Sequence, residues 1–151
     1  MIISAKQAYE HAYINGLTFP PNWYITKNFK WSEAFTNEKT SDGIPIFEVF
    51  QNIVLMATQL QKIRDNIGLP IIVHCWVRQV PHNKRAGSTA KYSPHINGRA
   101  VDFHIQGMSE SAARQKILNM GLPIRIEANT VGWVHNDISN YVTPFKAGLF
   151  Y

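Results

Sequence analysis

Residues 93–105, SPHINGRAVDFHI, contain a loop and the strand that follows it. From position 100 onward two sets of side chains alternate, Ala100, Asp102 and His104 against Val101, Phe103 and Ile105. Alternation with a period of two predicts a half-buried β-strand over residues 99–105, with one face in the core. The other face would present a carboxylate and an imidazole, directly after a polar loop that we expect from Gln79 to Asn97.

Upstream of this loop the sequence predicts a long helix and a second strand. Apolar residues recur at three- and four-residue spacing between Phe47 and Ile67, as in an amphipathic helix, and Gly68 follows its end. The run IIVHCWV, residues 71–77, is rich in β-branched residues and predicts a strand. The first 45 residues are rich in aromatic and turn-forming residues, so we expect an arm or small subdomain there.

Downstream of the strand the sequence predicts a second helix and a hairpin. The helix runs from Glu110 to Met120, with Ser109 as its N-cap. The runs IRIEA, residues 124–128, and GWVHNDI, residues 132–138, are expected to form the two strands of the hairpin. This order of elements predicts an α+β fold with a small, mostly antiparallel sheet and flanking helices.

The composition is that of a folded protein. Of the 151 residues 45% are hydrophobic and 17% charged, which excludes a disordered chain. This length predicts one domain, residues 1–151, in which residues 1–27 form an N-terminal arm. No apolar run approaches the roughly 20 residues that span a bilayer, and the start lacks the pattern of a signal peptide. We therefore expect neither membrane insertion nor a signal peptide.

The net charge of +5 is concentrated in one stretch. Between Asp65 and Asp102 there is no acidic residue, whereas basic residues are frequent there: Arg78, Lys84, Arg85, Lys91 and Arg99. Localised positive charge attracts an anionic partner such as nucleic acid, an acidic lipid surface or an acidic polymer. The same stretch also fits a solvated loop with a role in solubility. No nucleic-acid-binding motif accompanies it, so we do not expect nucleic acid as a partner.

Three side chains have the chemistry of a metal site. His95 lies in the predicted loop, Asp102 on the strand after it, and His135 on the last predicted strand. Imidazole nitrogen and carboxylate oxygen both bind Zn²⁺, and three protein ligands leave a further position for water or substrate. Other divalent ions tolerate the same ligands.

The setting of these residues resembles a known family. SPHINGRAVD, residues 93–102, is similar to the S-x-H-x-x-G-x-A-x-D signature of zinc peptidases related to D-Ala-D-Ala carboxypeptidases, the peptidase M15 family. The run WVH that ends at His135 resembles their W-x-H signature. Residues 60–83 resemble the family's preceding helix, strand and S-x-x-R segment, with Cys75 where serine is common. The resemblance covers residues 28–138 and implies a Hedgehog/DD-peptidase-like fold with a zinc site at the sheet.

The resemblance implies roles for the matching residues. His95, Asp102 and His135 would be the zinc ligands. Arg78 would contact the substrate or the developing oxyanion, with a salt bridge to a nearby acid as the alternative. Ser93 would hydrogen-bond a substrate carboxylate, or serve as a turn residue of the loop.

The general base is where the sequence departs from the family pattern. Family members often have Glu or Asp three residues before the final histidine, but this position holds Gly132. Two acids are near in sequence, Glu127 and Asp137. A three-residue turn in the hairpin would put Glu127 on the face of His135, whereas a two-residue turn would put it on the opposite face. We expect Glu127 to act as the base and Asp137 to orient an imidazole.

The implied function is a zinc-dependent peptidase that hydrolyses the stem peptides of bacterial peptidoglycan. It would be a D-Ala-D-Ala carboxypeptidase or an L-Ala-D-Glu endopeptidase. NFKWSEAF, residues 28–35, resembles the start of members often encoded by bacteriophages, which implies a lysin. Such a lysin would be present in the cytoplasm of the producing cell or on a virion, and would act on the cell wall. The alternative is a non-catalytic zinc-binding phage structural or tail protein of the same fold, which Gly132 keeps open.

Overall fold

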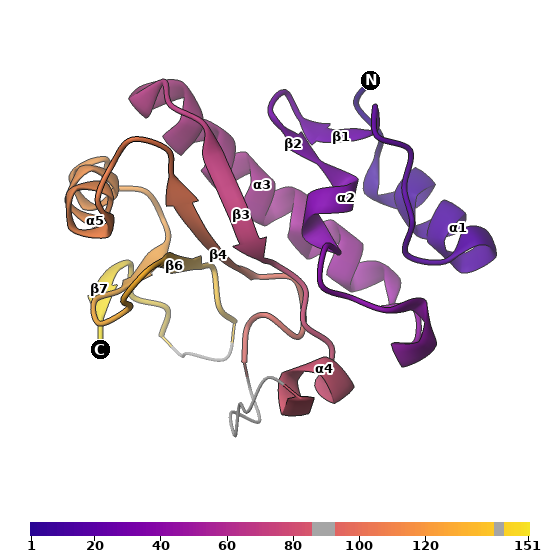
Figure 1. Ribbon diagram of the computed structural model, residues 1–151. Coiled ribbons are helices and arrows are strands. Elements are labelled where there is room, and N and C mark those ends of the chain that lie inside the picture. Colours follow the sequence, from indigo (N-terminus) through magenta and orange to yellow (C-terminus); the bar gives the residue numbers. More distant parts are fainter. Residues whose placement is uncertain (86–92, 141–143) are drawn as a thin grey trace.

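A five-stranded sheet with the order β3-β4-β6-β5-β7 forms the centre of the protein (Figure 1). The computed structural model describes residues 1–85, 93–140 and 144–151, apart from the side chains of Asn83 and Arg85. Neighbouring strands are antiparallel, except that β5 and β7 are parallel. The strands of this sheet are β3 Ile71–Cys75, β4 Ala100–Ile105, β5 Arg125–Glu127, β6 Val134–Asp137 and β7 Gly148–Phe150. The predicted α+β fold with a small, mostly antiparallel sheet is confirmed.

The long helix α3, Phe47–Ile67, has the predicted bounds and passes behind β3 in Figure 1. Its buried side chains, such as Phe50 and Leu60, share one hydrophobic core with Val101 and Phe103 of β4. The remaining elements are α1 Ala5–Asn15, α2 Trp31–Ala34, the 3-10 helix η1 Thr40–Asp42, α4 Val80–Arg85, α5 Glu110–Asn119 and the small hairpin of β1 Tyr24–Thr26 with β2 Phe29–Lys30. Within the described ranges no helix is long and apolar enough to cross a membrane.

The alternation along β4 sets the two faces of the sheet. Val101, Phe103 and Ile105 are buried in the core, whereas Asp102 and His104 are half-buried on the outer face. The strand register places Asp102 opposite His135 of β6. Because residues opposite each other in a sheet share a face, the register alone brings two of the predicted ligands together.

Two segments differ from what the sequence predicted. The N-terminal arm contains a regular helix, α1, whose N-terminus is closed by a capping box between Ser4 and Gln7. The S-x-x-Q pattern of these residues is a sequence signal for a helix start. The polar loop expected between Gln79 and Asn97 begins with α4, while residues 86–92 lie outside the described part of the chain.

Candidate metal centre

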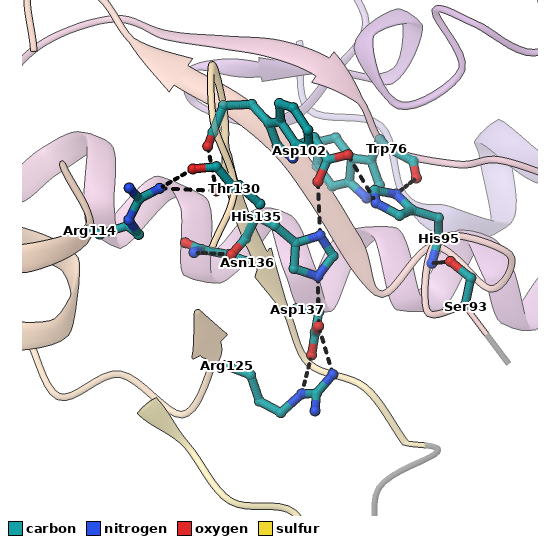
Figure 2. Close-up of polar contacts among 11 residues, drawn as sticks. Trp76, Ser93, His95, Asp102, Arg114, Arg125, Thr130, His135, Asn136 and Asp137 are labelled. Carbon is teal, nitrogen blue, oxygen red and sulfur yellow. Dashed lines mark hydrogen bonds and ion pairs between the residues drawn. The ribbon is translucent and has the colours of Figure 1, made fainter. Parts of the chain in front are cut away.

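His95, Asp102 and His135 converge on the outer face of the sheet (Figure 2). One ligand atom from each residue lies within 4.8 Å of those of the other two. His95 comes from the loop before β4, Asp102 from β4 itself and His135 from β6. The two imidazoles and the carboxylate form a donor set that suits Zn²⁺ and related borderline cations.

The ring of His95 is held in one orientation. Its Nδ1 lies 2.7 Å from the carbonyl oxygen of Trp76, which only accepts, so Nδ1 carries hydrogen and donates it. Its Nε2 therefore faces the cluster, 3.3 Å from Oδ2 of Asp102. An imidazole that donates from one nitrogen to a backbone carbonyl leaves the other nitrogen available to a metal.

The ring of His135 is fixed from the opposite side. Nδ1 lies 2.8 Å from Oδ1 of Asp102, and Nε2 lies 2.7 Å from Oδ2 of Asp137. Asp137 is buried and accepts two further bonds from Arg125, Nε to Oδ1 at 2.7 Å and Nη2 to Oδ2 at 3.0 Å. This arrangement leaves Nδ1 of His135 as the atom that could bind a metal, and Arg125 and Asp137 orient the ring, as expected for Asp137.

The electrostatics of the cluster favour cations. Burial by itself would lower the pKa of His95, but hydrogen bonds to Asp102 and Cys75 outweigh burial and raise it to about 10. Burial would raise the pKa of Asp102, but hydrogen bonds to His135 and His95 lower it. For His135, burial is outweighed by hydrogen bonds to Asp102 and Asp137, so its pKa is raised. A cation bound here would take the place of these protons and release them.

Comparison with protein families gives a match over residues 24–137 to one described as Peptidase M15. The chain belongs to the peptidase M15 family. The matched range contains all three residues of the cluster and most of the sheet. No curated protein and no solved structure matches the chain. Membership indicates a metal-dependent peptidase with peptidoglycan as its general substrate class, and the donor set of the cluster fits the metal that such a peptidase requires.

The loop that carries His95, the first candidate ligand, is docked on α3. Gly98 has φ +79, and a Cβ there would lie 3.0 Å from the carbonyl oxygen of Val49. Asn52 of α3 donates from Nδ2 to Asn97 O at 2.9 Å, and Trp76 donates from Nε1 to Gly98 O at 3.1 Å. These contacts fix the backbone around His95, so the glycine is required by a close approach of loop and helix.

Ser93 lies at the start of this loop and is buried. Its Oγ accepts a hydrogen bond from the backbone N–H of His95 at 3.3 Å. The structure thus gives Ser93 the contact of a loop turn residue, and its role with a substrate carboxylate stays a prediction.

Arg78 follows the end of β3 and joins the same loop. Its backbone N–H donates to the carbonyl oxygen of His95 at 3.0 Å. None of the ion pairs within the described residues includes Arg78, and its Nε is buried without a hydrogen-bond partner. The described residues therefore show no salt bridge between Arg78 and an acid. The Nε–H of its guanidinium remains available to donate a hydrogen bond to a substrate.

Cys75, which stands where the family commonly has serine, lies beside the candidate metal cluster. The register of β3 and β4 shifts between Val73 and Cys75, so His74 and Cys75 both lie opposite Asp102. Such a β-bulge changes the direction of a side chain and is frequent beside active sites. The Cys75 thiol consequently interacts with His95. The sequence shows no turn residue that would have revealed the bulge.

The position of Glu127 depends on the connection between β5 and β6. The two strands pair as predicted, but residues 128–133 connect them, so neither a two- nor a three-residue turn is present. Arg114 of α5 holds this connection by donating to the backbone oxygen of Thr130 at 3.2 Å and to its Oγ1 at 3.0 Å. Extended by one pair, the register sets Glu127 opposite His135, on the face that the three-residue turn predicted.

The C-terminal strand β7 adds a residue that the sequence did not suggest. Phe150 pairs with Glu127 in the register of β5 and β7, and its ring centroid lies 5.9 Å from that of His135. The guanidinium carbon of Arg125 lies 4.0 Å from the centroid of the Phe150 ring. The aromatic ring thus packs against both a candidate ligand and the arginine that holds Asp137, although it lies outside the family match. A three-residue strand is too short to show a periodic pattern.

Proposed function

We propose that the protein is a zinc-dependent peptidase that cleaves the stem peptides of bacterial peptidoglycan. The observation that carries this proposal is the convergence of His95, Asp102 and His135 in an M15 domain. In each imidazole the ring nitrogen that points away from the cluster is hydrogen-bonded to an oxygen acceptor. When bound to these three residues, Zn²⁺ polarises a carbonyl group and activates water as a nucleophile.

The chain's own residues supply the remaining parts of a peptide hydrolysis. Water adds to the scissile carbonyl carbon, the C–N bond breaks, and one proton must pass from the water to the leaving amine. Glu127 is the acid proposed to transfer this proton, because it lies on the face of His135 and none of the described residues occupies its carboxylate. Asp137 is unsuited, since it is buried and bonded to His135, Arg125 and the N–H of Ser139.

Arg78 is proposed to bind the substrate. Its guanidinium is permanently charged and has a buried nitrogen without a partner, which fits the binding of a developing oxyanion or a stem-peptide carboxylate. A terminal carboxylate would be present in a D-Ala-D-Ala carboxypeptidase reaction, whereas an L-Ala-D-Glu endopeptidase would use the same group for the oxyanion. Ser93 is proposed as a second substrate contact only through the resemblance of its loop.

The segment NFKWSEAF, residues 28–35, favours a lysin of phage origin as the biological setting. It contains β2 and α2. The strand β2 pairs with β1, and the ring centroid of Trp31 on α2 lies 5.8 Å from that of Phe50 on α3. A non-catalytic phage tail protein would share the metal cluster and this segment, so hydrolysis itself has to distinguish the two.

Incubation of the metal-loaded protein with purified peptidoglycan tests the proposal. We expect release of peptide fragments or of D-Ala, detected by mass spectrometry, and loss of release when a chelator removes the metal. The masses identify the bond that is cut. A protein that binds one Zn²⁺ tightly and releases nothing from peptidoglycan would be the non-catalytic alternative.

The substitution Glu127→Gln tests the proposed base. Loss of a general base lowers the rate by about 10²–10⁴-fold, while the zinc content should stay at the wild-type value because Glu127 is not part of the ligand cluster. The matched control is Glu10→Gln, an exposed acid on α1, which should leave both the rate and the zinc content unchanged. Wild-type hydrolysis by Glu127→Gln would exclude Glu127 as the base.

A further inference from the structure

A second pair of histidines lies on the outer face of the sheet. Nε2 of His74 is 2.5 Å from Nδ1 of His104, and the two ring centroids are 4.8 Å apart with an interplanar angle of 57°. His74 is exposed and His104 half-buried, and the described residues offer their ring nitrogens no other polar partner. The pair is separate from the cluster of His95, Asp102 and His135.

The pairing of β3 with β4 accounts for this meeting of two rings, because Ile72 lies opposite His104 and His74, two residues further along β3, shares its face. The shift between Val73 and Cys75 makes His74 the additional residue of the β-bulge. The backbone oxygen of His74 accepts a hydrogen bond from Nδ2 of Asn37 at 2.6 Å, which holds the bulge from the side of α2. The ring is thereby directed along the outer face toward His104, two residues after Asp102.

Two converging imidazole nitrogens are a chelating pair for borderline divalent cations such as Zn²⁺, Ni²⁺ and Cu²⁺. With metal–nitrogen distances near 2.0 Å, two nitrogens on a tetrahedral Zn²⁺ lie about 3.3 Å apart. The observed separation of 2.5 Å would have to widen by roughly 0.8 Å to reach this value. The exposed ring of His74 is free to make that adjustment, and water would complete the coordination.

We propose that His74 and His104 form a second divalent-cation site, weaker than the first and adjacent to it on the same face. It is weaker because it offers only two neutral imidazoles, whereas the first cluster offers two imidazoles and a carboxylate. Residues two apart on a strand are about 7 Å from one another, so a cation at His104 would stand close to the one held by Asp102. If the proposed hydrolysis takes place, excess cation would obstruct the approach of substrate, and this consequence alone rests on the proposed function.

Titration of the metal-free, untagged protein with Zn²⁺ tests the second site without any measurement of activity. We expect calorimetry to resolve a tight and a weaker equivalent in the wild type. Both His74→Gln and His104→Gln should lose the weaker equivalent and keep the tight one, whereas His95→Ala should lose the tight one and keep the weaker. The matched control is His11→Gln on α1, which should change neither equivalent; the ring of His11 is hydrogen-bonded to the carbonyl oxygen of Thr18.

The possible results separate the second site from the proposed function. One equivalent in the wild type, or a second equivalent that survives in both His74→Gln and His104→Gln, would overturn the second site and leave the first intact. If the wild type bound no Zn²⁺ tightly, the proposed metallopeptidase would be overturned instead. The two glutamine variants are independent, and circular dichroism shows which of them folds, so a folding defect in one leaves the other as the test.

Discussion

At the scale of single residues, Asp137 is the side chain on which the geometry of His135 depends. Its carboxylate joins Nε2 of His135 to the guanidinium of Arg125. Replacement by asparagine removes the charge that both partners require, so Asp137→Asn should lower Zn²⁺ affinity by about 10–100-fold. Competition with a chelating dye measures this change.

An acid elsewhere provides the control for this substitution. Asp65 is exposed on α3 and accepts a hydrogen bond from Gln61, so Asp65→Asn should bind Zn²⁺ like the wild type. Equal affinities of Asp137→Asn and wild type would show that the orientation of His135 does not depend on Asp137.

The three candidate ligands could be predicted because their residue types and their spacing match known signatures. His95 and Asp102 belong to one signature, and His135 belongs to another. The second histidine pair could not be predicted, because it depends on the register in which β3 and β4 pair, which no local pattern of the sequence specifies. The place of Cys75 beside His95 has the same cause.

At the scale of elements, the docking of the loop 93–99 on α3 predicts a difference between two glycines. Both Gly98, with φ +79, and Gly121, with φ +64, are in the left-handed region, where alanine costs about 1–2 kcal/mol. At Gly98 a Cβ would also lie 3.0 Å from Val49 O and 3.1 Å from Cγ1 of Ile53, whereas at Gly121 it would meet nothing within 4 Å.

Gly98→Ala should therefore lower the free energy of unfolding more than Gly121→Ala. The additional loss should be roughly 1–3 kcal/mol, the cost of overpacking against the backbone. Urea denaturation of the metal-free proteins measures the difference. If the two variants were equally stable, the loop would not be held tightly against α3.

The helices α3 and α5 and the strands β3 to β6 were predicted from local patterns, whereas α1, α4 and β7 were not. The helix α3 has the predicted bounds because 21 residues repeat one apolar stripe, and Ser109 caps α5 as its side chain indicated. The helix α1 was missed although Ser4 and Gln7 carry a capping-box pattern. The pairing of β7 with β5 joins segments that are separated in the sequence, so no local sequence pattern predicts it.

At the scale of the whole molecule, the position of the positive charge matters more than its amount. The acid-free stretch between Asp65 and Asp102 begins in the last turn of α3 and ends on β4, at the candidate metal centre. Lys84 is exposed on α4, while Lys91 and the side chain of Arg85 lie outside the described residues. We therefore expect an anionic partner to bind around the candidate metal centre.

Replacing Lys84, Arg85 and Lys91 by glutamine tests whether this charge attracts cell-wall polymer. The triple variant should bind purified cell wall more weakly than the wild type at low salt, and the difference should shrink as salt screens the charges. Zinc content should not change, because none of the three residues is a candidate ligand. The matched control replaces Lys6, Lys27 and Lys39, which are exposed in the first part of the chain, and lowers the net charge equally. Sedimentation with insoluble wall at several salt concentrations measures both; if the two triple variants lost binding equally, net charge and not its position would control the association.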